Sequence, residues 1–556
     1  MRKVALTIAV TAVLAGTALV AAPPLWAASA AADALTGQVT SAREGPMEGV
    51  LVSAKPEGGT ISVTVVSDAK GRFAFPASKI GPGHYNLKIR AVGYDLEGPK
   101  TVDVAAGGRA KADLRLAPTA NLAAQLSDAE WMESMPGTED QKRSLYDCVV
   151  CHTVERIVRS KHTPDEWVRV YKRMSAYSQG AIPEHPQRRR AVEPTSPREE
   201  ASMKAVADWM ATINLSTSPV WSYPLKTFPR PKGRATRIVI TEYDLPRKYA
   251  QPHDVIVDSK GTAWYADFGE QIIGKLDPKT GKATEYAVPT LKPGWPTGIL
   301  EAAFDKDENI WLALMHQGGI AKFDTRTEKF AAYPLPKEIQ GDRTQESMVS
   351  PSSSHVDGKV WTNKQDDHSF WRLDVATGAW ENLGVFPIPG ENRNIAGYGM
   401  PTDKDNNVYI LEYSAGDIGR IDAKTKALTV YKTPTPRSQP RRGGVDEQGR
   451  VWFAEFGVNR IGMFDPKTES MREWKLPTPW NGPYQVLADN KGEAWSGAML
   501  SDRVHRLNPK TGAITEYLLP RQTNVRRVFV DSSTVKSTFW VGNNHGASIV
   551  KLEPLD

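Results

Sequence analysis

Cysteine is almost absent from this chain, since only two of its 556 residues are cysteines. One pair cannot form the disulfide framework that stabilises many small secreted domains, so the fold has to rest on hydrophobic cores. Both cysteines belong to a single stretch, Cys148-Val149-Val150-Cys151-His152, in which two thiols and an imidazole come together. This stretch is the strongest candidate for chemistry in the sequence.

A large excess of one charge sign is also missing. The chain has 70 basic and 64 acidic residues, a formal net charge of +6 and a pI near 8.9. The basic residues are scattered among acids except at Arg188-Arg189-Arg190, and no RNA- or DNA-binding motif is present. We therefore expect no nucleic-acid partner and interpret the charge as a solvated surface, with docking of an acidic redox partner as the second interpretation.

Long apolar runs are confined to the N-terminus. Met1-Arg2-Lys3 is positive, an apolar run follows from Val4 to Ala22, and Ala28-Ser29-Ala30 fits the small-x-small cleavage rule. This pattern predicts a secretory signal peptide over residues 1–30; the alternative is an uncleaved anchor helix. We expect no transmembrane segment after signal cleavage and a periplasmic or otherwise exported location in a bacterium.

The cysteine motif predicts one covalent haem c. Two thiols separated by two residues form thioethers to the haem vinyl groups, and the adjacent imidazole is the proximal iron ligand. Cys148 and Cys151 are thus predicted to attach the haem and His152 to bind its iron. A thioredoxin-like pair should follow a strand in a βαβ unit, which is absent here, and a disulfide leaves the adjacent histidine unexplained.

The sixth iron ligand is less determined by the sequence. Met174 is the candidate distal ligand because it stands on the apolar stripe of a predicted helix shortly after the motif. Its alternative role is an ordinary core methionine. Met203, Met210, His162 and His185 are further candidates, and an open sixth position is also allowed.

Residues 31–120 read as a small β-sandwich. Short alternating strands are separated by glycines, as in Gly71-Arg72-Phe73-Ala74-Phe75 and His84-Tyr85-Asn86-Leu87-Lys88-Ile89. The order Gly37-x-Val39, Gly49-Val50-x-Val52, Asp68-x-x-Gly71 and Gly93-Tyr94 resembles the carboxypeptidase regulatory-like domain, a transthyretin-like sandwich. That resemblance implies a non-catalytic module.

Residues 121–215 are predicted to be helical. Ser127-Asp128-Ala129-Glu130 and Thr163-Pro164-Asp165-Glu166 are capping boxes, and a last helix is expected from Arg198 to Ile213. Short helices around the cysteine motif resemble a small all-α single-haem cytochrome c. The flanking residues also resemble a haem domain of quinohaemoprotein amine dehydrogenases. A Pro-rich, semi-rigid linker is predicted over 216–236.

The remaining residues, 237–556, form a repeat. Aromatic anchors that follow Asp-rich turns recur about every 43 to 50 residues, which is the period of a propeller blade. The anchors are Trp264, Trp311, Trp361, Tyr409, Trp452, Trp495 and Trp540. They predict seven blades. The last repeat lacks its closing strand, so Ile240–Pro246 is predicted to complete the last blade.

The repeated Trp-Phe-Ala-Glu, Ile-Gly-x-x-Asp and Thr-Glu-Tyr-x-Leu-Pro patterns resemble the streptogramin B lyase (virginiamycin B lyase) propeller family. That resemblance implies a site with two Pro-His histidines, a glutamate and magnesium. Here only Pro252-His253 matches, so His253 is the catalytic candidate; Pro296-Thr297 and Val525-Arg526-Arg527 occupy the corresponding loops. One histidine cannot serve as base, acid and metal ligand together.

Polar residues are also expected to converge at the propeller mouth. Loops before the innermost strands carry His253, Trp295, Tyr398, Arg441, Arg442, Tyr484, Gln485, Arg526 and Arg527. Three carboxylates follow their blade anchors by three places: Asp267, Glu412 and Glu455. Converging Arg442 and Arg527 would suit an anion and converging carboxylates a divalent cation. The alternative is that these rim residues pair with one another.

Taken together, the sequence predicts a multidomain, mainly β protein that transfers electrons in the periplasm through one haem. The propeller would bind a redox partner or a small-molecule substrate. A second hypothesis is a propeller enzyme, either a lyase or a dehydrogenase component. A third is a haem-bearing sensor or scaffold.

Overall fold

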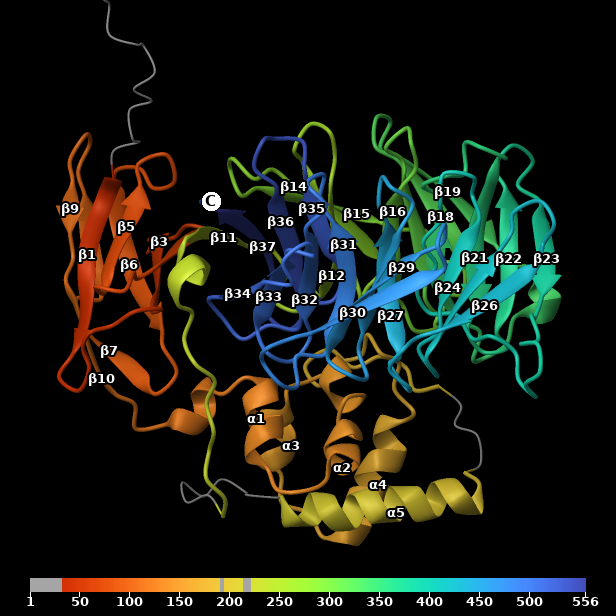
Figure 1. The fold of residues 1–556 in the computed structure, drawn as a ribbon, viewed down its shortest axis with the longest axis horizontal. Coiled ribbons are helices and arrows are strands. Elements are labelled where there is room, and N and C mark those ends of the chain that lie inside the picture. Colours follow the sequence, from red (N-terminus) through yellow and green to blue (C-terminus); the bar gives the residue numbers. More distant parts are fainter. Residues whose placement is uncertain (1–32, 191–194, 214–221) are drawn as a thin grey trace, which may run out of the picture.

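The computed structural model describes residues 33–190, 195–213 and 222–556. The predicted signal peptide lies outside these residues, as does the first part of the predicted linker. No helix within the described ranges is long and apolar enough to cross a membrane. Three regions are visible in Figure 1: a β-rich N-terminal region, a helical region, and a ring of small sheets whose one face rests on the helices.

The N-terminal region is the predicted sandwich. One of its sheets has the order β2-β1-β10-β7, with β5 and β9 also paired to β1, and the other runs β4-β3-β6-β8. Phe73 and Phe75 are buried, whereas Arg72 and Ala74, which alternate with them, are exposed, as expected of a strand with one covered face. The strands are β1 (Asp33–Ser41), β2 (Gly45–Pro46), β3 (Leu51–Pro56), β4 (Ile61–Val66), β5 (Arg72–Pro76), β6 (Gly83–Arg90), β7 (Tyr94–Gly98), β8 (Thr101–Val104), β9 (Ala110–Lys111) and β10 (Leu114–Pro118).

The propeller consists of seven successive blades in the described chain, and blades five and six are joined into one eight-stranded sheet where Arg442 lies opposite Gln485. Blades one to three are β12 (Pro252–Val257), β13 (Ala263–Asp267), β14 (Ile272–Leu276) and β15 (Ala283–Ala287); β16 (Ile299–Phe304), β17 (Ile310–Leu314), β18 (Gly319–Asp324) and β19 (Lys329–Pro334); β20 (Glu346–Ser350), β21 (Lys359–Lys364), β22 (Ser369–Asp374) and β23 (Trp380–Gly384). Blades four to six are β24 (Val408–Leu411), β25 (Asp417–Ile421) and β26 (Leu428–Lys432); β27 (Pro440–Val445), β28 (Val451–Glu455), β29 (Arg460–Asp465) and β30 (Ser470–Lys475); β31 (Pro483–Ala488), β32 (Ala494–Ala498), β33 (Arg503–Leu507) and β34 (Ile514–Leu518).

The repeat has a clear physical basis at its Asp-rich turns. Asp258 accepts a hydrogen bond from the Trp264 indole N–H at 2.9 Å, and its other carboxylate oxygen accepts from the backbone N–H groups of Lys260 and Thr262. Asp446 and Trp452 repeat the indole bond at 2.8 Å. Each aspartate thus closes a turn and satisfies a buried indole at once, which explains why the pair recurs.

The ring closes as predicted. The seventh blade is built from β35 (Val528–Asp531), β36 (Thr538–Asn543), β37 (Ser548–Pro554) and, from the front of the repeat region, β11 (Ile238–Asp244). Strands β11 and β37 are antiparallel, in register from Ile238 opposite Pro554 to Asp244 opposite Ser548. This join removes two open edges.

The other edge of β11 was not predicted to be paired. It forms an antiparallel ladder with β4 of the sandwich, from Val65 opposite Val239 to Ile61 opposite Tyr243. Blade seven and one sandwich sheet therefore form a single eight-stranded sheet. The N-terminal region is fixed to the propeller through main-chain hydrogen bonds.

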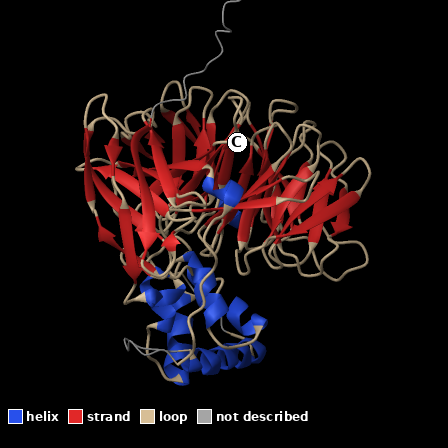
Figure 2. Ribbon diagram, turned by 60° about the vertical axis from the view of Figure 1, so that its left-hand side comes forward, coloured by secondary structure: helices blue, strands red, loops and turns tan. Residues whose placement is uncertain are grey.

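The helical region packs below the ring (Figure 2). Its elements are η1 (Leu122–Gln125), α1 (Asp128–Ser134), α2 (Glu139–Arg143), η2 (Cys148–Val150), α3 (Val154–Val158), α4 (Pro164–Met174) and α5 (Pro197–Thr212). The capping boxes at Ser127 and Thr163 are confirmed, and Pro164 opens α4 as expected. The predicted apolar face of the last helix is confirmed by buried Met203, Ala207 and Met210.

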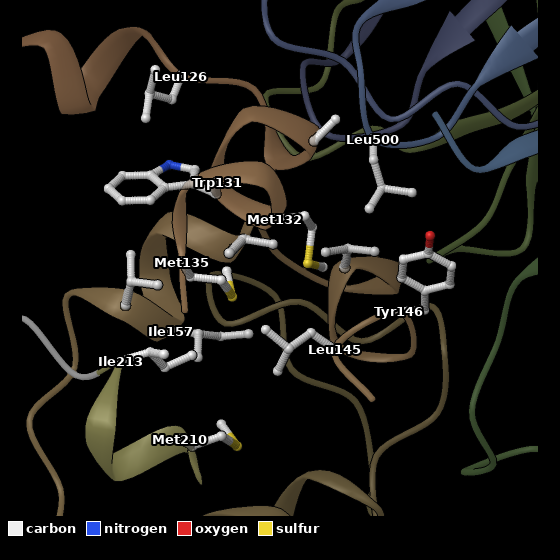
Figure 3. Packing of buried hydrophobic residues seen from close by; sticks show 14 of the residues in the cluster. Leu126, Trp131, Met132, Met135, Leu145, Tyr146, Ile157, Met210, Ile213 and Leu500 are labelled. Carbon is white, nitrogen blue, oxygen red and sulfur yellow. The ribbon is translucent and has the colours of Figure 1, made fainter. Parts of the chain in front are cut away.

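The core of the helical region continues into the propeller. Trp131, Met132, Leu145 and Met210 share one buried cluster with Leu500 of the ring, and Figure 3 shows this packing. A common apolar core across two regions means that they are not loosely tethered domains.

The predicted linker is not a free spacer in its described part, residues 222–236, which contains η3 (Gly233–Thr236). The Lys226 N–H donates to Ser134 Oγ at 2.8 Å, and the Phe228 N–H donates to Glu130 Oε1 at 2.8 Å. Arg503 of the propeller donates to the Pro229 carbonyl at 2.9 Å. The prolines thus lie along a seam between regions, because their segment is hydrogen-bonded on both sides.

Candidate functional site at the propeller mouth

The cysteine motif lies between α2 and α3 and is pressed against the centre of the propeller. Val149 is fully buried. The Asn524 side-chain amide donates to the Val149 carbonyl at 3.1 Å, and the Arg526 guanidinium donates to the Val150 carbonyl at 2.7 Å. The two residues between the cysteines are therefore held by the ring, which leaves the cysteines and His152 at the boundary of the two regions.

The two thiols are not joined in a disulfide: Cys148 packs against the apolar core, and Cys151 Sγ donates to the Gln179 carbonyl at 3.6 Å. Burial raises the pKa of Cys148 to about 12 and that of Cys151 to about 11, where the nearby Arg526 charge opposes the rise. Both thiols are consequently protonated at neutral pH. Reactive cysteines need a thiolate in an electropositive, partly exposed position, so this environment does not suit a redox pair. A neutral thioether is compatible with it.

His152 has the geometry of a metal-ligating histidine. Its Nδ1 lies 3.1 Å from the Thr153 carbonyl oxygen, so Nδ1–H donates there and Nε2 carries the free lone pair. Burial lowers the pKa of the ring, which favours the neutral imidazole that binds metals.

Helix α4 lines the same place with apolar side chains. Of its predicted stripe only Trp167 is buried; Tyr171 is 38% exposed and Met174 is 40% exposed. The alternative role of Met174 as an ordinary core methionine is thus not what the structure shows. Tyr171 lies near Cys148, since burial first and then the charges of Cys148 and Asp147 raise its pKa. An uncovered apolar face beside the thiols suits a flat apolar group, so the residues present fit a haem.

The remaining candidates for the sixth ligand occupy other environments. Met203 and Met210 are buried in the shared core. The His162 ring lies 4.8 Å from that of Trp167, and His185 lies 3.8 Å from Glu270. Met174 stays the predicted distal ligand, because it combines exposure with a place on the helix that carries Tyr171.

The propeller mouth directly above the motif contains a hydrogen-bonded chain around His253, which is fully buried. Its Nδ1 lies 2.6 Å from Asp254 and its Nε2 3.3 Å from the Tyr484 hydroxyl, which in turn bonds to the Tyr398 hydroxyl. Burial lowers the pKa of His253 to about 3. The ring is therefore neutral, enclosed and already partnered.

Arginines converge at the mouth as predicted, although they divide into two pairs. Arg442 and Arg527 bind a carboxylate, whereas Arg441 and Arg526 lie against aromatic rings. Arg442 and Arg527 reach Asp254 at 3.1 and 3.2 Å, and Arg527 also pairs with Glu301 at 2.7 Å. Arg441 instead stacks on aromatic rings, 4.0 Å from the centroid of Tyr484. The first pair confirms the interpretation that mouth residues pair with one another.

The three predicted carboxylates do not meet, because each is held within its own blade. Asp267 pairs with Arg247 at 2.6 Å, and Glu412 with Arg393. Glu455 is fully buried beside Glu473, and burial first and then that neighbouring carboxylate raise its pKa to about 9. No group of three metal-binding side chains occurs among the described residues. The three carboxylates therefore do not converge, contrary to the prediction that they could hold a divalent cation together.

Several site residues escaped the sequence analysis. Asp254 and Glu301 neutralise the arginines, and Asn524 holds the motif. Asp254 directly follows the predicted histidine, so adjacency was the available signal. Nothing in the repeat pattern indicated that Asn524 would contact a helical region far away in sequence.

Comparisons with known proteins agree with two of the three regions. Residues 382–554 match the virginiamycin B lyase family, and residues 34–117 match the carboxypeptidase regulatory-like domain. The chain thus carries a virginiamycin B lyase-like propeller domain and a carboxypeptidase regulatory-like domain. Neither matched range includes the helical region. No curated protein matches.

Similar solved structures are distant. A streptogramin B lyase structure is 21% identical, covering 58% of this chain and 99% of its own, with a TM-score of 0.49. A catalytically inactive virginiamycin B lyase from Staphylococcus aureus, solved with quinupristin, is 21% identical over 56% of this chain and 98% of its own, with a TM-score of 0.48. The extracellular domain of a putative one-component system from B. thetaiotaomicron is 18% identical over 54% and 40%, with a TM-score of 0.41.

Proposed function

We propose that this protein is an exported c-type haem protein that transfers electrons, with the propeller serving as the platform for its haem-attachment loop. The supporting observation is the Cys148-x-x-Cys151-His152 loop itself. It combines two buried, protonated thiols with an imidazole whose Nδ1 donates to a carbonyl. This donor set fits covalent haem better than it fits a disulfide, a zinc site or a reactive thiol pair.

Each of these residues would have a separate role in holding the haem. Cys148 and Cys151 attach the group, His152 presents Nε2 to the iron, and Met174 is the proposed distal ligand. When bound, the haem supplies one reversible electron, taken from a donor that is oxidised by one electron and passed to an acceptor that is reduced by one. The propeller excludes water from one side of the loop, because Val149 and its neighbours pack against the ring.

The exchange partner is proposed to be a small periplasmic redox protein. Among the described residues, the propeller mouth shows no open substrate site on the face that the helical region covers, because His253 is fully buried there. Export is proposed from the N-terminal sequence.

Attachment is tested on the full chain produced in a host that attaches haem c. We expect haem to remain with the denatured protein through acid-acetone extraction and to be weakened by Cys148→Ser or Cys151→Ser. The reduced protein should be reoxidised by a small cytochrome. Haem that extracts from the parent protein, or a parent without haem, would contradict the proposal.

A lyase function is the second candidate, because the propeller domain is virginiamycin B lyase-like. The site geometry weighs against it. His253 is bound to Asp254 and Tyr484, while Thr297 and Arg527 are engaged with Gly269 and Glu301. We expect no appreciable linearisation of streptogramin B antibiotics, even with excess magnesium. Turnover that disappears in His253→Ala would reverse this ranking.

A further inference from the structure

Arg526, like Arg441 and unlike Arg442 and Arg527, has no carboxylate partner among the described residues, and it contacts the haem-attachment loop. Its side chain is 1% exposed. Nε donates to Asn524 Oδ1 at 2.7 Å and Nη2 to the Val150 carbonyl at 2.7 Å, and its guanidinium lies 4.6 Å from the Phe268 ring centroid. In the described part of the chain no carboxylate lies within ion-pairing distance of it. Its positive charge is thus buried with only neutral partners.

This charge contacts the haem-attachment loop on one side and the Phe268 ring of the propeller on the other. The Val150 carbonyl that it contacts belongs to the residue directly before Cys151. The position is therefore within electrostatic reach of whatever the two cysteines and His152 carry.

A buried charge acts more strongly than an exposed one at the same distance, because water and salt screen the exposed charge. Asp147, beside Cys148, is exposed. Arg442 and Arg527 share the buried carboxylate of Asp254. Among these groups Arg526 is the one whose field reaches the loop without a compensating partner.

We propose that Arg526 is a positioning residue of the propeller that acts on the haem in two ways. It fixes the haem-attachment loop through the Val150 carbonyl, and its buried positive charge favours the reduced state of the haem. The inference rests on the proposed function. Ferric haem carries one more positive charge than ferrous haem, so a nearby fixed cation disfavours the ferric state and raises the reduction potential. Asn524 helps to position the loop but carries no charge: its Oδ1 accepts from Arg526 Nε, and its amide donates to the Val149 carbonyl.

The test is a spectroelectrochemical titration of the full-length haem-loaded protein and four single-residue variants. In Arg526→Gln the ratio of reduced to oxidised haem at a fixed ambient potential should fall about tenfold. Arg526→Lys retains the charge and should stay within about twofold of the parent, and so should Asn524→Ala, which loses hydrogen bonds only. Asp147→Asn, the exposed-charge control, should also shift the ratio less than twofold.

Thermal unfolding of the same proteins separates charge from folding. If Arg526 were merely structural, Arg526→Gln and Asn524→Ala would lower the melting temperature together and leave the potential unmoved, which would overturn the inference. Equal potentials for the Gln and Lys variants would also overturn it. Absence of covalent haem in the parent would instead contradict the proposed function, so the two failures are distinguishable.

Discussion

The propeller is joined to the rest of the chain in two different ways. At its rim, β11 lies between β37 and β4, and the joint consists of main-chain ladders on both sides. At its mouth, the helical region is held by buried side chains, such as Tyr146 against Phe456, and by guanidinium and amide donors on loop carbonyls. The rim joint tolerates sequence change at its side chains, whereas the mouth joint depends on particular residues. The proposed haem loop belongs to the second kind.

The largest effect is expected from breaking the rim joint. Thr241 lies opposite Lys551 in one ladder and Val63 in the other, so Thr241→Pro removes backbone pairing within an eight-stranded sheet. We expect a loss of roughly 5 kcal/mol or more, seen as loss of cooperative unfolding by circular dichroism.

Thr284→Pro is the matched control for that variant. Thr284 lies in β15, which pairs on one side only, with β14. Edge strands tolerate proline better than central ones, so the control should unfold cooperatively and closer to the parent. Equal damage in both variants would mean that β11 does not behave as a central strand.

The mouth joint should break at its apolar contacts. The Tyr146 ring lies 4.9 Å from that of Phe456 and 6.4 Å from that of Trp480, centroid to centroid. Tyr146→Ala should therefore destabilise the docked state by roughly 3–5 kcal/mol. Calorimetry should show the helical region unfolding before the propeller; one unchanged transition would show that the regions unfold together for another reason.

The mouth joint should also depend on pH, in contrast to the rim ladders. Glu455 precedes Phe456 and has a folded-state pKa of about 9, against 4.5 for the ordinary group. As the pH rises from 4.5 towards 9 the unfolded state loses this proton while the folded state keeps it, so stability falls. Glu455→Gln should therefore stabilise the protein clearly at pH 8 and by almost nothing at pH 4.5. A gain that is equal at both pH values would rule out Glu455 as the cause.

The smallest effect should come from a single polar contact at the mouth. Trp480 Nε1 donates to Glu133 at 3.0 Å across the interface. Trp480→Phe keeps most of the ring and removes that donor, so we expect a loss of about 1 kcal/mol in chemical denaturation. A loss as large as that of Tyr146→Ala would show that polar contacts, and not apolar burial, dominate the mouth joint.

The same two joints explain what the sequence could and could not predict. The blades and their closure were predictable, because the Asp258–Trp264 turn and the Thr-Glu-Tyr strand repeat with the blade. The arginines of the mouth were predictable for the same reason. Pairing of β4 with β11 was not, since any edge strand offers the same donors and acceptors.

Docking of the helical region could not be predicted from the sequence for a different reason. The carbonyls of Val149 and Val150 carry no side-chain signal, so their contacts with Asn524 and Arg526 arise only once the chain has folded. The amphipathic pattern of α4 was correctly located, but the sequence could not show which of its apolar residues are covered, because periodicity does not show what covers a face.

The central claim is that the loop held at the propeller mouth carries covalent haem. Mass spectrometry of the tryptic peptide spanning residues 144–156 of the full-length protein tests it most directly, because trypsin cleaves after Arg143 and Arg156. The account predicts one haem added to this peptide through both cysteines, and loss of one or both linkages in the serine variants. An unmodified peptide, or one with a Cys148–Cys151 disulfide, would contradict it.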